Sequence, residues 1–228
     1  MLEKGKRPLT SICIPTYNRA DVLQNCLDSI VNNKAFCDKI EVYVGDNAST
    51  DSTEQLLREY SSRYPNVRYY TNPKNIGGER NFIKILETAN GEFLKLHNDY
   101  SVFTENGLGD VLLCVEKYSK DRPLLFFDMD HKQSLYINDV TDSLDKIFMK
   151  ERWAMSWIGS YGYWREDFLP LADKEGKKDT LFLQLDWFLR IFIKKRRCVI
   201  CESRFSNRYP FKAKLGGYDF IKVHTWDV

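Results

Sequence analysis

The sequence has no excess of charge of either sign, no long apolar run and only three histidines. Its 34 basic and 32 acidic residues nearly balance, so it lacks the overall positive field of a nucleic-acid-binding protein and no nucleic-acid partner is expected. No stretch reaches the length of about eighteen apolar residues that a membrane span needs, and the first residues, MLEKGKRPLT, lack the apolar core of a signal peptide. We therefore expect a cytoplasmic protein whose contacts with anions are local.

Six cysteines occur at irregular spacing, and buried thiols are their expected state in a reducing cytosol. Cys198 and Cys201 have the spacing of a redox or zinc pair, but they lie in an apolar, strand-like run where residues three apart face opposite sides. A zinc site would also need two further ligands. Buried thiols are therefore favoured, and metal or redox chemistry is the alternative.

Short apolar segments alternate with amphipathic segments in the first half of the chain. The sequence predicts strands at residues 9–15, 39–45, 66–70 and 92–96, and helices at residues 20–31, 52–64 and 81–89. The second half is less regular, with helices predicted at 107–118 and 180–194, a strand at 123–128 and an edge strand at 133–137. This order is typical of an α/β fold with a mostly parallel central sheet that is flanked by helices.

A polar segment follows each of the first four predicted strands. In a parallel sheet the ligand lies beyond the carboxyl ends of the strands, so these segments are expected to converge on one edge. They are Pro15-Thr-Tyr-Asn-Arg19, Asp46-Asn-Ala-Ser49, the run from Asn72 to Arg80, and His97-Asn-Asp99.

Several of these residues suit a nucleotide and its phosphates. The carboxylate of Asp46 could accept a hydrogen bond from a base or a ribose, although an aspartate in such a turn often bonds its own backbone. Tyr17 stands beside Asn18 and Arg19, which together could stack on a nucleotide and grip it. Arg19 and Arg80 are the expected phosphate partners.

Other segments restrict the class of protein. The residues that begin at Asn47 are best interpreted as the cap of the next helix. Neither a dinucleotide fingerprint nor a lysine-bearing phosphate loop is present, so dehydrogenases and P-loop enzymes are disfavoured. The first polar segment, PTYNR, also lacks the glycine-rich loop expected of a nucleotidyltransferase.

Two acidic residues could carry chemistry. Asp99 follows the fourth predicted strand, and a divalent ion that bridges a diphosphate needs only one or two protein carboxylates; a plain turn is the alternative. Asp186 lies within an apolar helix, where it is expected either to pair with Arg190 at i+4 or to face a polar cleft.

The aromatic run WAMSWIGSYGYW could form a platform for a sugar, since sugar faces stack on aromatic rings, or could pack in the core. The candidate platform residues are Trp157, Tyr161 and Trp164. His224, one of the three histidines, is either structural or a metal ligand.

Taken together, residues 8–200 resemble family 2 glycosyltransferases with a GT-A fold. The resemblance rests on the segments PTYNR, VGDNASTD and NIGGERN, on GEF followed by Asn98 and Asp99, and on Leu185-Asp-Trp187 followed by Arg190. It implies that a nucleotide-binding set, a metal-binding set and a catalytic base are present. The implied nucleotide-binding residues are Pro15, Thr16, Tyr17, Asn18, Arg19, Asp46, Asn47, Arg80 and Asn98.

The resemblance also implies a chemistry. Asp99, with His224 as a further ligand, would hold Mn²⁺ or Mg²⁺, and Asp186 would act as general base on an acceptor hydroxyl. The expected division is a flexible terminus at residues 1–7, a nucleotide-sugar-binding half at 8–128, and an acceptor-binding half at 129–228 that carries the catalytic base.

The implied reaction is the inverting transfer of a sugar from a nucleotide diphosphate, UDP by default, to a hydroxyl of a glycan or glycolipid, as in bacterial surface polysaccharide or capsule synthesis. The alternative is a weak or inactive module that binds a nucleotide sugar or acts as a scaffold for a complex. Basic residues around 194–214 could contact anionic lipid at the inner face of the membrane, or could simply be solvated.

Overall fold

A computed structural model describes residues 7–128, 135–150, 154–176 and 182–208. Within these ranges no helix is both long enough and apolar enough to span a membrane. The predicted ligand His224 and most of the expected flexible terminus lie outside the described residues.

The described part of the chain is built on an eight-stranded sheet with the order β3-β2-β1-β4-β8-β6-β9-β7. Strands β1 to β4 run parallel, β8 is antiparallel to both of its neighbours, and β6 and β9 are again parallel to one another. The predicted mixed, mostly parallel α/β fold is thereby confirmed. The strands are β1 (Thr10–Thr16), β2 (Ile40–Asp46), β3 (Val67–Thr71), β4 (Phe93–Leu96), β6 (Leu124–Asp128), β7 (Tyr136–Ile137), β8 (Tyr161–Trp164) and β9 (Cys198–Glu202).

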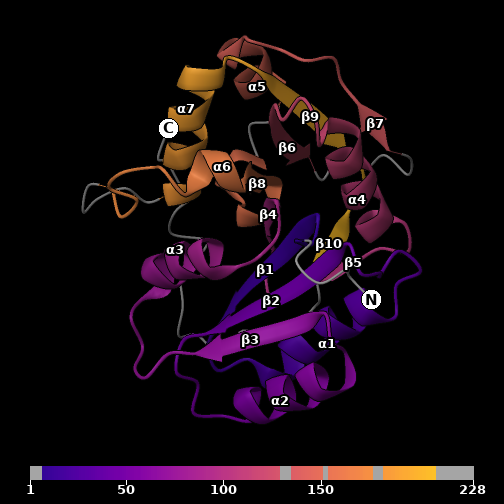
Figure 1. The fold of residues 1–228 in the computed structure, drawn as a ribbon, viewed down its shortest axis with the longest axis vertical. Coiled ribbons are helices and arrows are strands. Elements are labelled where there is room, and N and C mark those ends of the chain that lie inside the picture. Colours follow the sequence, from indigo (N-terminus) through magenta and orange to yellow (C-terminus); the bar gives the residue numbers. More distant parts are fainter. Residues whose placement is uncertain (1–6, 129–134, 151–153, 177–181, 209–228) are drawn as a thin grey trace, which may run out of the picture.

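Helices cover both faces of this sheet (Figure 1). Buried side chains of α1 (Ala20–Val31), α2 (Thr53–Arg63) and α4 (Gly107–Tyr118) pack on one face. The opposite face is covered by α3 (Gly78–Thr88), α5 (Leu144–Lys150), α6 (Arg165–Phe168) and α7 (Leu183–Lys195), with two short 3₁₀ turns at Ala154–Ser156 and Ile158–Ser160.

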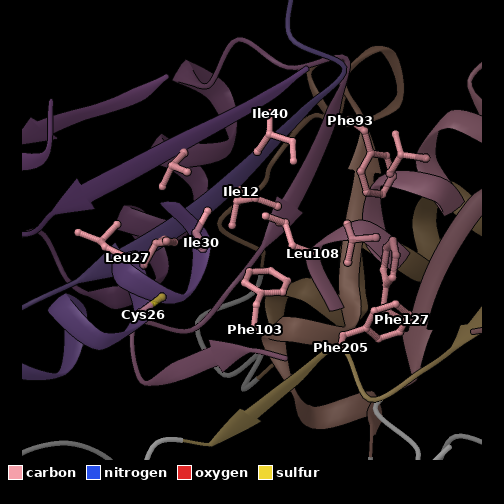
Figure 2. Packing of buried hydrophobic residues seen from close by; sticks show 14 of the residues in the cluster. Ile12, Cys26, Leu27, Ile30, Ile40, Phe93, Phe103, Leu108, Phe127 and Phe205 are labelled. Carbon is pink, nitrogen blue, oxygen red and sulfur yellow. The ribbon is translucent and has the colours of Figure 1, made fainter. Parts of the chain in front are cut away.

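The two faces follow from the side-chain alternation of the strands. In β1, Ile12 and Ile14 join the cluster under α1, α2 and α4, whereas Cys13 joins the opposite cluster. Figure 2 shows the first cluster, where Ile12 lies near Leu108 and Phe127 packs edge-to-face against Phe205 with ring centroids 5.4 Å apart. Apolar residues on both faces explain why the strands read as continuous apolar runs in the sequence.

A small second sheet pairs β5 (Ser101–Phe103) with β10 (Ser206–Arg208) in antiparallel register. Strand β5 begins directly after the polar segment that follows β4. The late part of the chain therefore pairs with the strand that directly follows this segment, a contact between distant residues that the sequence did not predict.

Five of the six cysteines are buried as expected, and Cys37 is half-buried. Cys198 and Cys201 form no disulfide, are completely buried and belong to opposite clusters of the core. A shared redox or zinc site between these two thiols is therefore excluded by the geometry of the strand.

Two further differences from the prediction concern α3 and the large sheet. Helix α3 begins at Gly78 rather than at residue 81, because Gly77 adopts a φ of 87° and turns the chain into the helix. Strand β8 was not predicted, and it inserts between β4 and β6 from the second half of the chain. One sheet thus takes strands from both halves.

Candidate functional site

Strands β1 and β2 end side by side at the carboxyl edge of the sheet. Thr16 and Asp46, their last residues, are register partners, and the backbone N–H of Asn47 donates to the carbonyl of Thr16 at 3.0 Å. Strand β4 lies on the other side of β1, where the N–H of His97 donates to the carbonyl of Cys13 at 2.9 Å. The predicted convergence of these strand ends is present.

Asp99 is the centre of this edge. Its Oδ2 accepts a hydrogen bond from the Thr16 hydroxyl at 3.0 Å, and its Oδ1 pairs with Nη1 of Arg19 at 2.9 Å. Burial raises the pKa of Asp99, while Arg19 and the Thr16 hydroxyl act in the opposite direction. The guanidinium of Arg19 also lies 5.8 Å from the centre of the Tyr100 ring. Two segments about eighty residues apart in sequence thus meet at one carboxylate.

The two carboxylate oxygens of Asp46 have different environments, which correspond to the two expected roles of bonding the local backbone and binding a ligand. Oδ1 accepts from the backbone N–H of Ser49 at 3.1 Å and from the Ser49 hydroxyl, which closes the turn. Oδ2 is buried and has no hydrogen-bond partner within the described residues. An ionised oxygen in such a place costs free energy unless a donor meets it, so Oδ2 is suited to an N–H or O–H of a ligand.

Asn18 and Asn47 hold the loops around Asp46. Asn18 Oδ1 accepts from the Thr50 N–H at 2.7 Å and so joins the first polar segment to the second. Asn47 Oδ1 accepts from the Ile76 N–H and from Asn72 Nδ2, both at 3.0 Å. Both side chains therefore order the site in this structure.

Sequence reasoning missed a buried network behind Asp46. Asn81 of α3 donates to the carbonyl of Gly45 at 2.8 Å and accepts from the Tyr70 hydroxyl at 2.9 Å and from Asn72 at 3.1 Å. Lys84 donates to Asn72 at 2.6 Å. The sequence signal for this network was the repetition of asparagine after β3, at Asn72, Asn75 and Asn81.

The remaining predicted nucleotide residues have different environments. Pro15 is buried and opposite Gly45 in the sheet register. The Tyr17 side chain is 43% exposed, so its ring is free to stack. Arg80 lies on the surface, where its guanidinium pairs with the carboxylate of Glu175 at 3.3 Å. Unlike Arg19, it does not pair with Asp99 in this structure.

Two basic residues are buried beside the carboxyl edge of the sheet: Lys95 on β4 and His97 just after it. Lys95 donates to the carbonyls of Leu96, at 2.9 Å, and of Gly159, and burial lowers its pKa to about 7. His97 contacts the carbonyl of Ser101 through Nε2 at 3.0 Å. Burial, with the nearby Lys95 charge, lowers the pKa of His97 to about 3, so the ring is a neutral structural group.

Asp186 lies in the first turn of α7 and pairs with Nη1 of Arg190 at 3.2 Å. About a third of each side chain is exposed. The same turn of α7 is tied to the 3₁₀ segment before β8, since Gln184 Nε2 donates to the carbonyl of Ser156 at 3.3 Å. Asp186 thus has the expected i+4 partner and remains accessible to solvent.

Of the three candidate platform residues, only Trp157 is partly exposed. Tyr161 and Trp164 are completely buried, and their polar atoms donate to the carbonyls of Met155 and Pro123. Neither ring presents a face to solvent, because β8 carries both into the core. Trp157 is only partly buried and lies just before β8.

The segments that form this edge also carry the family signal. Residues 11–123 match the sequence model of Glycosyl transferase family 2. The chain belongs to this family. Among curated relatives of this family, the abequosyltransferase RfbV of Salmonella typhimurium is 34% identical over 120 residues, which make up 48% of this chain and 36% of that protein. The chain therefore spans about a third of that relative.

Solved structures share the fold of this family 2 chain. TarS 1-349 of S. aureus in complex with UDP-GlcNAc aligns with a TM-score of 0.67 at 16% identity, covering 92% of this chain and 61% of that one. The mannosyltransferase PcManGT of Pyrobaculum calidifontis, in complex with GDP-Man and Mn2+, aligns with a TM-score of 0.60 at 18% identity, covering 89% and 58%. The fold is thus that of GT-A glycosyltransferases.

A metal ion would find a minimal donor set in this family 2 chain. No cluster of three or more His, Cys, Asp or Glu side chains capable of holding a metal occurs in the described ranges. Asp99 supplies one carboxylate, whose oxygens already contact Thr16 and Arg19. This set fits Mg²⁺ or Mn²⁺ only when phosphate oxygens and water complete the coordination.

Proposed function

We propose that this chain binds a nucleotide-diphospho-sugar at the carboxyl edge of its sheet and transfers the sugar, with inversion, to a hydroxyl of a glycan or lipid-linked glycan. UDP is the proposed donor nucleotide. The observation that carries the proposal is the buried, unpartnered Oδ2 of Asp46, next to the group formed by Thr16, Arg19 and Asp99.

The base and ribose are assigned to the β1–β2 side of the edge. Asp46 Oδ2 would accept an N–H of the base or a ribose hydroxyl, and the exposed Tyr17 ring would stack nearby. The loops that Asn18 and Asn47 tie together hold this side rigid, which lowers the ordering cost of binding.

The diphosphate is assigned to Asp99 and Arg19. A divalent ion at Asp99, when bound, would neutralise charge on the diphosphate. The guanidinium of Arg19, which pairs with Asp99 in this structure, would then be released toward phosphate oxygens, and Arg80 is the second candidate cation.

Asp186 is the proposed general base. Its carboxylate would take the proton of the acceptor hydroxyl while that oxygen forms a bond to the anomeric carbon. The bond from the anomeric carbon to the diphosphate breaks at the same time, and the nucleoside diphosphate leaves with the electron pair. Attack from the face opposite the leaving group inverts the configuration. Arg190 at i+4 would hold the carboxylate in place.

Calorimetric titration of UDP, CDP, GDP and dTDP, with and without Mn²⁺, tests the proposal. We expect one nucleotide to bind to the wild type, and Asp46→Asn to weaken it by about 1.5–3 kcal/mol, or roughly ten- to a hundred-fold in Kd, because an amide N–H₂ would replace the accepting oxygen.

Two further variants separate the roles. Asp99→Asn should remove the dependence on Mn²⁺, whereas Asp186→Asn should bind the nucleotide as the wild type does. Absence of binding by all four nucleotides would overturn the proposal, and equal affinity of Asp46→Asn and wild type would remove Asp46 from the site.

A further inference from the structure

Two buried N–H groups beside the proposed site have no acceptor. They are Nδ2 of Asn98, in a side chain that is 7% exposed, and Nε1 of Trp157. Within the described residues neither atom has a hydrogen-bond partner. Leaving a donor buried and unpaired costs about 1–3 kcal/mol each, so a ligand that supplies an acceptor here gains more than an ordinary surface hydrogen bond.

The two donors converge although they come from different parts of the chain. Asn98 follows β4, and Trp157 lies in the turn before β8. Gly159 lies between them: a Cβ at this residue would lie 3.5 Å from Trp157 Nε1 and 3.8 Å from Asn98 Nδ2. Because residue 159 is a glycine, no side chain of its own lies against the two donors.

The carbonyls around the two donors already accept hydrogen bonds. Lys95 donates to the carbonyl of Gly159, the Ser160 N–H donates to that of Trp157 at 3.1 Å, and the Ser101 N–H donates to that of Asn98 at 3.2 Å. The hydroxyl of Ser160, buried without a partner in the same turn, can donate as well as accept. The unpaired atoms here are thus two N–H donors and one hydroxyl, and a ligand oxygen that only accepts can meet both N–H groups.

The position along the edge indicates which part of the donor is recognised. The strand order β2-β1-β4-β8 places Asp46 at the end of β2, Thr16 at the end of β1, the adjacent Asn98 and Asp99 after β4, and Trp157 just before β8. Trp157, and Asn98 beside it, therefore lie on the side of Asp99 away from Asp46. If the base lies at Asp46 and the diphosphate at Asp99, as the proposed function has it, the next group is the transferred sugar. This step rests on the proposed function.

We propose that Asn98 and Trp157 bind the carbonyl oxygen of an acylamino group on the transferred sugar. The pair thereby selects an N-acylamino sugar over the corresponding sugar that carries a hydroxyl. Lys95 is a positioning residue for this pair, because its amine donates a hydrogen bond to the carbonyl of Gly159.

Titration calorimetry with UDP, UDP-N-acetylglucosamine and UDP-glucose tests the pair. The wild type should prefer UDP-N-acetylglucosamine to UDP-glucose. Asn98→Leu and Trp157→Phe should each lose about five- to ten-fold in affinity for UDP-N-acetylglucosamine, because each variant removes one N–H donor and leaves an apolar side chain of related shape. Trp157→Phe should also keep the wild-type affinity for UDP.

Gly159→Ala gives an independent test, since its methyl group would meet only ordinary contacts and the chain should fold. It should lower the affinity for UDP-N-acetylglucosamine and leave that for UDP unchanged. Trp164→Phe is the matched control: it removes an indole N–H at the other end of β8, where Trp164 bonds Pro123, and should keep the wild-type preference.

The outcomes distinguish the two proposals. If UDP binds but the wild type shows no preference, or the preference survives in Asn98→Leu, Trp157→Phe and Gly159→Ala, the sugar subsite is overturned and the nucleotide site stands. If none of the three ligands binds, the proposed UDP-sugar site itself fails and the subsite fails with it.

Discussion

At the scale of the residue, Lys95 shows how burial sets charge under the site. The residue is 2% exposed, and its amine donates to two neutral carbonyls, those of Leu96 and Gly159. Burial therefore disfavours the ammonium form and lowers the pKa to about 7 from 10.5. The same amine holds the turn that carries Gly159, so its protonation state and the geometry of the edge are linked.

This pKa predicts how stability depends on pH. Between pH 7 and 10.5 the unfolded chain holds the Lys95 proton and the folded chain does not, so the contribution of Lys95 to stability rises with pH. From pH 7 to 9 the gain is about 2 kcal/mol. Urea unfolding of the wild type and Lys95→Met at pH 7, 8 and 9 measures it: the free energy of the wild type should rise relative to the variant. Parallel pH curves would show that Lys95 keeps an ordinary pKa.

At the scale of the element, helix α3 is joined to β2 and β3 by Asn81. The side chain is 2% exposed and bonds the Gly45 carbonyl, the Tyr70 hydroxyl and Asn72. Gly45 is required at this point, because a Cβ there would lie 2.5 Å from the Tyr70 oxygen. The network thus fixes the strand end that presents Asp46.

Asn81→Ala should destabilise the fold by about 2–4 kcal/mol, because the Gly45 carbonyl, the Tyr70 hydroxyl and an N–H of Asn72 each lose a hydrogen bond. Urea unfolding at neutral pH measures the effect. Thr88→Ala on the same helix is the control: its hydroxyl is exposed, bonds only the Lys84 carbonyl, and should change stability by less than about 0.5 kcal/mol. Similar values for the two variants would refute the structural role of Asn81.

At the scale of the whole molecule, one sheet connects the two halves of the chain. Strand β8 pairs with both β4 and β6, and Arg122 bridges Glu92 and Glu166 at 2.7 and 2.6 Å. A shared sheet and core favour a single cooperative unfolding transition.

The positions of the tryptophans make this testable. All five lie between residues 153 and 226, so their fluorescence reports on the second half, whereas far-ultraviolet circular dichroism reports on both. The two urea transitions should have the same midpoint. A separate midpoint for the fluorescence would mean that the second half unfolds independently and that the shared sheet does not couple the halves.

The outcomes for individual residues show what kind of inference a sequence supports. Thr16, Asp46 and Asp99 were found because each follows a strand in a regular β–α alternation, and parallel strands bring their carboxyl ends together. For Tyr161 and Trp164 the sequence left both a sugar platform and core packing open, because an aromatic run looks the same whether a strand carries it into the core or a loop leaves it in solvent. The structure buries both residues.

By itself, the sequence determined the α/β class, the parallel first half and the edge where Thr16, Asp46 and Asp99 meet, since these depend on periodicity and on the local rule for strand ends. Only the tertiary structure decided that β8 enters the sheet beside β4. That antiparallel pairing joins residues far apart in the chain, and it brings Trp157 and Gly159 next to Asn98. The physical reason is that such contacts depend on which distant segments pack together, and the core of both halves sets that choice.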